Sequence, residues 1–133
     1  MVGVVADTHV IVWYLGNDPN LSAAASFALD EAVRSGELIQ IPSICLVEIT
    51  YLVEKGRLPD TAKKRLFDTL DGLPTTCRVE PLTRQVAEAI DHILGSDVAD
   101  LPDRIIAATA FALGLPLVTR DRRIRSSVIE TIW

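Results

Sequence analysis

The chain contains little cysteine and no long hydrophobic run. Its two cysteines, Cys45 and Cys77, lie apart without CxxC or histidine spacing, which excludes a zinc motif and a disulfide framework. A reducing cytoplasm is therefore the expected compartment. The longest apolar run, Val10 to Leu15, is far shorter than the roughly 20 residues of a membrane-spanning helix, so no membrane span is expected. The start MVGVVADTH has no basic region and does not resemble a signal peptide.

Basic residues are also scarce relative to acidic ones. The chain has 13 Lys and Arg against 18 Asp and Glu, which gives a formal charge of −5. A nucleic-acid-binding surface normally needs a basic footprint, so this balance by itself argues against one. The strength of the objection depends on where the carboxylates lie, because divalent ions held by clustered acids offset their charge.

Several common catalytic motifs are missing. The sequence has no glycine-rich phosphate loop or dinucleotide motif, and no Ser-His-Asp or Cys-His set is visible. What the chain does have is 133 residues, 49% of them hydrophobic. That is enough to build one domain with an ordinary core, so we expect a single domain over residues 1–133.

Short apolar segments alternate with helix-like segments along the chain. Strands are expected at residues 2–6, 38–41, 77–82 and 115–119, with a fifth over 129–133. Helices are expected at residues 8–15, 23–33, 44–51, 61–70, 86–94 and 102–113, with Ser22, Ser43 and Thr83 as N-caps. This alternation predicts an α/β fold with a central parallel sheet of four to five strands flanked by helices. In such sheets, ligands bind at the carboxyl ends of the strands.

Acidic residues fall where such a sheet gathers them. Asp7 follows the first strand and Asp121 follows the fourth, so both are expected at the carboxyl edge. Glu48 interrupts an apolar helical stretch, where an ionised carboxylate must be paired, protonated or bound to a metal. Asp100 and Asp103 share one face at the start of a helix, and the N-terminus of that helix favours their ionised form.

Each acid also has an ordinary structural interpretation. Asp7 and Asp100 suit helix N-caps, and for Asp100 this interpretation is favoured. Glu48 can pair with an arginine, and Asp103 and Asp121 can serve a helix dipole and a turn. These interpretations do not explain why separate segments bring acids to one edge. Carboxylates without nearby His or Cys suit Mg²⁺ or Mn²⁺, so a metal site is the shared interpretation.

Four segments carry a family resemblance. They are VVADTHVIVWYL at the start, VEIT around Glu48, DLPDRIIAATA from Asp100 to Ala110, and LVTRD from Leu117 to Asp121. In this order they resemble the PIN-domain ribonucleases, and more narrowly the VapC toxins of bacterial type II toxin-antitoxin modules. The resemblance covers essentially the whole chain. It implies a PIN-like fold and RNA hydrolysis by an acidic quartet that holds one or two Mg²⁺ or Mn²⁺ ions.

The resemblance also implies the site residues and partners. The matching quartet is Asp7, Glu48, Asp103 and Asp121, with Asp100 as an additional acid and Thr8 and Thr119 as supporting hydroxyls. Family members commonly read Asp-Pro-x-Asp, whereas the proline here is shifted by one place to Pro102, which leaves the direction of the Asp100 side chain open. The implied partners are RNA, a VapB-like antitoxin and a second copy of the chain.

Other polar and aromatic residues border these motifs. We interpret the run Arg120, Arg122, Arg123 and Arg125 as a phosphate-binding surface, because arginine forks fit phosphate geometry. His9 is interpreted as a packed or edge histidine. Trp13 suits the core or a dimer interface better than a base-stacking role, because aromatics at helical spacing usually pack.

Two other functions stay open at this point. A Rossmann-like phosphatase also begins with a strand followed by Asp, but a dehalogenase-like site requires Asp-x-Asp, and the third position here is His9. A catalytically silent PIN-like domain that only binds proteins is the second alternative, against which the intact quartet argues.

Overall fold

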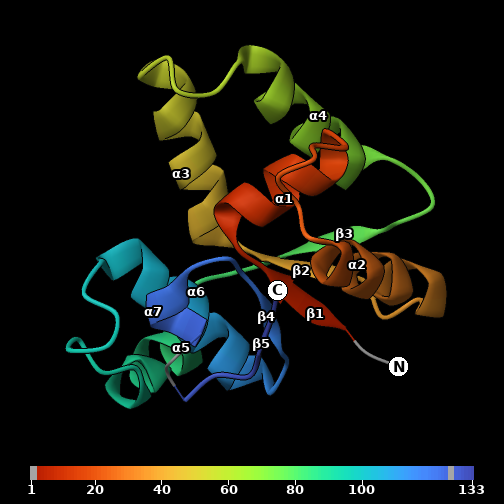
Figure 1. Cartoon of the computed structure of the whole chain (residues 1–133). Coiled ribbons are helices and arrows are strands. Elements are labelled where there is room, and N and C mark those ends of the chain that lie inside the picture. Colours follow the sequence, from red (N-terminus) through yellow and green to blue (C-terminus); the bar gives the residue numbers. More distant parts are fainter. Residues whose placement is uncertain (1–2, 126–127) are drawn as a thin grey trace.

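The computed structural model describes residues 3–125 and 128–133 (Figure 1). The strands are β1 (Val4–Ala6), β2 (Ile39–Pro42), β3 (Cys77–Glu80), β4 (Leu117–Val118) and β5 (Thr131–Ile132). The helices are α1 (Thr8–Leu15), α2 (Ala23–Ser35), α3 (Ser43–Glu54), α4 (Asp60–Asp71), α5 (Arg84–Ala89), α6 (Leu101–Leu113) and α7 (Arg122–Arg125), and a 3₁₀ turn (Ile90–His92) follows α5.

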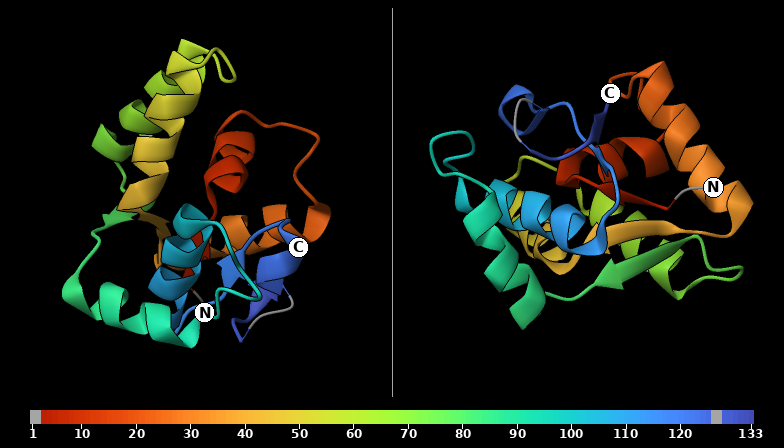
Figure 2. Two further views of the ribbon diagram at one scale, coloured as in Figure 1. Left: turned by 90° about the vertical axis from the view of Figure 1, so that its left-hand side faces the viewer. Right: turned by 90° about the horizontal axis from the view of Figure 1, so that it is seen from below.

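The strands form one parallel sheet in the order β3-β2-β1-β4-β5. The chain moves outward from β1 to β3 and then returns to β4 and β5. Because crossovers between parallel strands are right-handed, the helices before β3 lie on one side of the sheet and those after it on the other. Figure 2 shows α1, α3 and α4 on one side and α5 and α6 on the opposite side. The predicted parallel sheet is therefore confirmed, with β1 at its centre.

The core explains why such short strands suffice. The β1 residues Val4, Val5 and Ala6 are at most 1% exposed, and Ile39, Ile41, Leu117 and Val118 on the neighbouring strands are fully buried. Burial on both faces is what parallel strands covered by helices require. Within the described residues, no helix has the length and apolar character needed to cross a membrane.

Two predicted N-caps are confirmed. The Ser22 hydroxyl accepts the Ala25 N–H at 3.0 Å at the start of α2, and the Thr83 hydroxyl accepts the Val86 N–H at 3.2 Å at the start of α5. The first predicted strand begins at Val2, which lies outside the described residues. Its described part is residues 3–6, of which Val4–Ala6 form β1 and Gly3 does not belong to the strand.

The third predicted N-cap, at Ser43, is wrong. Pro42 occupies the cap position, and Ser43 is the first helical residue of α3. The Ser43 hydroxyl instead accepts the N–H of Leu82 at 3.1 Å. Leu82 lies just beyond β3, where the backbone N–H has no ladder partner, and a side-chain acceptor from the adjacent element satisfies it.

The helix predicted over residues 86–94 is shorter than expected. It ends at Ala89 and tightens into the 3₁₀ turn, after which Ile93 is extended. The guanidinium of Arg104 donates to the Ile93 carbonyl at 2.8 Å and to the Ile90 carbonyl at 3.3 Å. These carbonyls therefore find a partner on α6, a long-range contact that local periodicity cannot reveal.

Strand ends also differ from the prediction. The strand predicted over 77–82 ends at Glu80, because Pro81 lacks the N–H that a ladder needs. The strand predicted over 115–119 is only Leu117–Val118, and that predicted over 129–133 is only Thr131–Ile132. The arginine-rich turn contains the helical turn α7, where the Asp121 carboxylate accepts the Arg123 N–H at 2.8 Å.

Candidate active site

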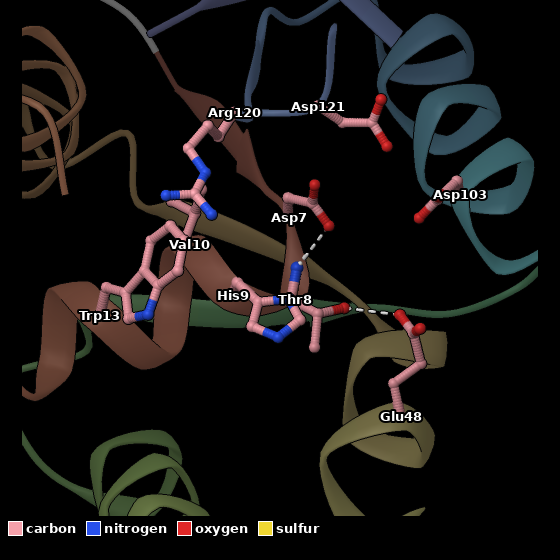
Figure 3. Close-up of a pocket in the computed structure, with 9 residues that line it drawn as sticks. All are labelled: Asp7, Thr8, His9, Val10, Trp13, Glu48, Asp103, Arg120 and Asp121. Carbon is pink, nitrogen blue, oxygen red and sulfur yellow. Dashed lines mark hydrogen bonds between the residues drawn. The ribbon is translucent and has the colours of Figure 1, made fainter. Parts of the chain in front are cut away.

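A pocket of about 340 Å³ opens at the carboxyl edge of the sheet (Figure 3). Its lining comprises Asp7, Thr8, His9, Val10, Trp13, Glu48, Asp103, Arg120 and Asp121. The four predicted quartet acids therefore lie together, although they come from the end of β1, from α3, from α6 and from the loop after β4. In Figure 3 the carboxylates of Asp7, Asp103 and Asp121 face the same space.

Asp7 is the most firmly fixed of these acids. It follows β1 and occupies the N-cap position of α1, where one carboxylate oxygen accepts the Thr8 N–H at 2.7 Å. The other oxygen accepts the Thr119 hydroxyl at 2.6 Å. Thr119 is fully buried, and its oxygen also accepts the Asp121 N–H at 3.1 Å. Thr119 thus links two of the four acids, which agrees with its predicted supporting position.

Glu48 is held by the second predicted hydroxyl. It lies on α3 and is half-buried, and its carboxylate accepts the Thr8 hydroxyl at 2.6 Å. Because Thr8 also donates its N–H to Asp7, this first residue of α1 links Asp7, which follows β1, to Glu48 on α3. Glu48 is compatible with an apolar helix because its carboxylate lines the pocket and does not enter the core.

Asp103 and Asp100 have different surroundings. Asp103 belongs to the first turn of α6 and is half-buried in the pocket wall. Asp100 is exposed, and its carboxylate accepts the Asp103 N–H at 3.2 Å as the N-cap of α6. The capping interpretation favoured for Asp100 is the one that the structure shows. Asp100 is not among the residues that line the pocket.

Proton affinity is increased at three of the acids. Burial, together with the charges of Asp7, Asp100, Asp121 and Glu48, raises the pKa of Asp103 to about 7. Burial also raises the pKa values of Asp7 and Glu48, against the opposing effect of the threonine hydrogen bonds. The expectation that the helix N-terminus favours ionised Asp103 is therefore wrong for the metal-free protein, because desolvation and repulsion outweigh the helix dipole.

In the described parts of the chain, no ion pair joins the four acids to a protein cation, although His9 and Arg120 also line the pocket. The ion pairs there are Arg34 with Glu31, Lys64 with Asp68, and Arg84 with Glu88, and none includes a pocket residue. Crowded carboxylates with raised proton affinity are a suitable donor set for a hard divalent cation. In residues 3–125 and 128–133, no three His, Cys, Asp or Glu side chains are arranged to enclose one ion.

The arginine run divides between two hollows. Arg120 lines the acidic pocket, with its guanidinium 4.8 Å from the centroid of the Trp13 ring. Arg122 and Arg125 line a neighbouring hollow of about 590 Å³ together with Thr131 and Trp133. Arg123 lines neither, because residues 122–125 form a helical turn whose side chains point in different directions.

Sequence reasoning did not place Trp13 in the pocket. Trp13 is half-buried and lines the pocket, so the predicted core position is wrong, whereas the predicted dimer interface stays a prediction. His9 is exposed, with its ring centroid 5.7 Å from that of Trp13, which agrees with an edge position. His9 and Trp13 are four positions apart, so they lie on the same face of α1. Because His9 follows Asp7 by only two residues, this spacing was the available signal that Trp13 lies near Asp7.

Comparison with known proteins shows what the chain is similar to. Ribonuclease VapC22 of Mycobacterium tuberculosis is 32% identical over 126 residues, which cover 95% of this chain and 92% of that protein. The structure of VapBC2 from Rickettsia felis bound to a promoter DNA fragment aligns with a TM-score of 0.69 at 19% identity, covering 99% of this chain and 100% of that one. A toxin-antitoxin complex from Klebsiella pneumoniae aligns with a TM-score of 0.68 at 21% identity, covering 98% and 96%.

The family assignment rests on sequence as well as fold. The model of the PIN domain family matches residues 4–127, which include the strands β1 to β4 and all four acids of the pocket. Ribonuclease VapC22 aligns with nearly the same length of this chain. The chain therefore belongs to the PIN domain family.

Proposed function

We propose that this chain is a metal-dependent endoribonuclease that acts as the toxin of a toxin-antitoxin pair. The observation that carries the proposal is the convergence of four carboxylates, from four separate segments, in one pocket where none of them forms an ion pair within the described residues. Its similarity to a ribonuclease and its fold similarity to chains of toxin-antitoxin complexes support it. A dehalogenase-like phosphatase is not favoured, because exposed His9 occupies the position of its second acid.

The proposed cofactor is Mg²⁺ or Mn²⁺, held by Asp7, Glu48, Asp103 and Asp121. When bound, such ions neutralise phosphate charge and lower the pKa of bound water. The protein contributes orientation. Both oxygens of Asp7 have fixed hydrogen-bond partners, so its remaining lone pairs keep a constant direction. Thr8 fixes one oxygen of Glu48 and leaves the other to bind a cation or to orient the attacking water.

The first prediction concerns metal binding. Mn²⁺ at about 100 times its Kd is expected to stabilise the folded chain by about 2.7 kcal/mol, because it binds the clustered carboxylates of the folded state only. For a chain of this length, this corresponds to a Tm increase of roughly 8 °C. Thermal unfolding with and without Mn²⁺ measures it, and RNA cleavage in excess EDTA should be lost. An unchanged Tm, or full cleavage in EDTA, contradicts the proposed cofactor.

The proposed partners are a VapB-like antitoxin and a second copy of the chain. The uncompensated acids suit the arginine of an antitoxin segment, because a guanidinium pairs with carboxylates in a bidentate manner. For the second copy, a mainly apolar hollow of about 420 Å³ lies on α3 and α4, which are side by side in Figure 2. It is lined by Leu46, Val47, Tyr51 and Phe67 together with the polar residues Thr50 and Glu54. Val47 is 62% exposed and Tyr51 is 53% exposed, so this face has apolar area to bury.

The second prediction tests the proposed homodimer. The Tyr51→Asp variant is expected to raise the dimer Kd roughly 30-fold or more, because a carboxylate must be buried in an apolar contact. Sedimentation of the wild type and the variant over a concentration series measures the change. Phe27→Asp, at an exposed aromatic on α2, is the matched control and should leave the Kd unchanged. A wild type that stays monomeric, or a Tyr51→Asp dimer of normal Kd, contradicts the proposed interface.

A further inference from the structure

Trp13 lies between the acidic pocket and the arginine-lined hollow. It lines the pocket, and its ring centroid is 6.1 Å from that of Trp133, which lines the hollow together with Arg122 and Arg125. The two indoles therefore connect a region of negative charge to a region of positive charge. A strand of RNA with one phosphate at the acids can extend across this aromatic surface toward the arginines.

Arg120 adds a planar cation to this aromatic surface. Its guanidinium lies 4.8 Å from the centroid of Trp13 (Figure 3), and the Arg120 side chain is exposed. Although Asp121 is its neighbour in sequence, Arg120 is in none of the ion pairs of the described residues. The guanidinium is therefore stacked on Trp13 without an ion-pair partner among the pocket acids, which leaves N–H donors available for a phosphate.

The chemistry of this surface matches one class of ligand. Proteins recognise single-stranded RNA by stacking its unpaired bases on aromatic rings and on arginine planes. Such stacking tolerates any sequence, because every base has a π face. A duplex hides these faces inside its base stack, so a stacking surface beside a catalytic pocket favours single-stranded substrate.

We propose that Trp13, with Arg120 stacked on it, is the platform for the base of a nucleotide next to the scissile phosphate. Arg122 and Arg125 contact a phosphate further along the strand. The proposal deepens the proposed ribonuclease function and rests on it. It names Trp13 as a residue that binds substrate directly, through a base next to the scissile phosphate.

The test combines a protein change with a substrate change. The probe is a labelled short single-stranded RNA, together with versions that lack the base at one position at a time. Binding is measured by fluorescence anisotropy in the Asp7→Asn background, which prevents cleavage. Trp13→Leu is expected to weaken binding of the intact RNA about 5- to 100-fold, the range for loss of one stacked base. Trp13→Phe should recover part of this loss, because it keeps an aromatic face.

The RNA without a base distinguishes stacking from a structural role. At one nucleotide position, removing the base should weaken RNA binding by the Asp7→Asn protein as much as Trp13→Leu does. The two changes together should reduce the binding affinity no more than either change alone. Equal Tm values of the variants show that the fold is kept. Phe27→Leu changes an exposed aromatic on α2 that lines neither the acidic pocket nor the arginine-lined hollow, so it is the matched control and should bind normally.

The outcomes separate this proposal from the proposed function. Two results would overturn the platform while the ribonuclease proposal stands, provided that the wild type cleaves RNA through Asp7. The first is normal RNA binding by Trp13→Leu. The second is a loss of affinity in Trp13→Leu that adds in full to the loss caused by each missing base. If the wild type cleaves no RNA with either metal, both are overturned. Non-additive losses at one nucleotide position support the platform.

Discussion

RNA cleavage by the Asp7→Asn variant is expected to fall by roughly 10²–10³-fold or more in kcat, while the fold stays intact. Loss of a single preorganised electrostatic group in a catalytic site has this magnitude, and Asp7 is proposed as a central metal ligand as well. The substitution removes the charge and preserves the shape. The amide oxygen still accepts the Thr8 N–H, and the amide nitrogen faces the Thr119 hydroxyl, which has a second acceptor site.

The measurement is single-turnover cleavage of RNA with saturating Mn²⁺, alongside circular dichroism and Tm. Asp71→Asn removes an exposed carboxylate at the end of α4 and should cleave normally. The proposed antitoxin should still copurify with Asp7→Asn, because the partner surface extends beyond one acid. Full activity of Asp7→Asn would refute the proposed site, and loss of antitoxin copurification with normal folding would refute the proposed extent of the partner surface.

Metal-free protein is expected to lose stability as the pH rises from about 4 to 7. The pKa of Asp103 is about 7 in the folded chain and about 3.9 when unfolded, so the folded state binds more protons between these values. The free energy of unfolding therefore decreases over this interval. Because Asp103 is partly exposed, we expect an effect on the order of 1–2 kcal/mol, or about 5 °C in Tm.

Asp103→Asn isolates this contribution, because asparagine keeps the shape and cannot ionise. In EDTA at pH 8 the variant is expected to be more stable than the wild type, and the difference should shrink toward pH 4. Addition of Mn²⁺ at pH 8 should reverse the order, since the wild type gains a ligand that the variant lacks. Thermal unfolding at a series of pH values measures all three effects. Parallel pH profiles of the two proteins would contradict the assigned pKa of Asp103.

The sheet and the convergence of the acids were predictable because they follow from local patterns and one topological rule. Buried β-branched segments such as Val4–Ala6 indicate parallel strands, and a parallel sheet brings the residues that follow its strands to one edge. Asp7 and Asp121 needed no further information. Glu48 stood out because its charge conflicts with an apolar helix. Asp103 stood out because it shares a face with Asp100 at the start of a helix, and the family resemblance then matched it to the quartet.

What could not be predicted depends on long-range side-chain contacts. Where α5 ends early, its last carbonyls accept hydrogen bonds from Arg104 on another helix, and the Ser43 hydroxyl accepts the N–H of Leu82, just beyond the end of β3. The pocket position of Trp13 was not predicted, because helical spacing identifies a face without saying whether that face meets the core or a pocket. Whether Asp100 points into the pocket could not be decided from a proline shifted by one place, whereas its hydrogen bond to Asp103 decides it.

The pairing of β1 with β4 sets the moment during synthesis at which the pocket is completed. Asp7 leaves the ribosome 112 positions before its Thr119 partner. A nascent chain that has not yet reached Leu117 contains Asp7, Glu48 and Asp103 yet lacks β4, Thr119 and Asp121. The four acids can therefore assemble only after Asp121 has been synthesised, so a translation product that stops before this residue does not carry the complete site.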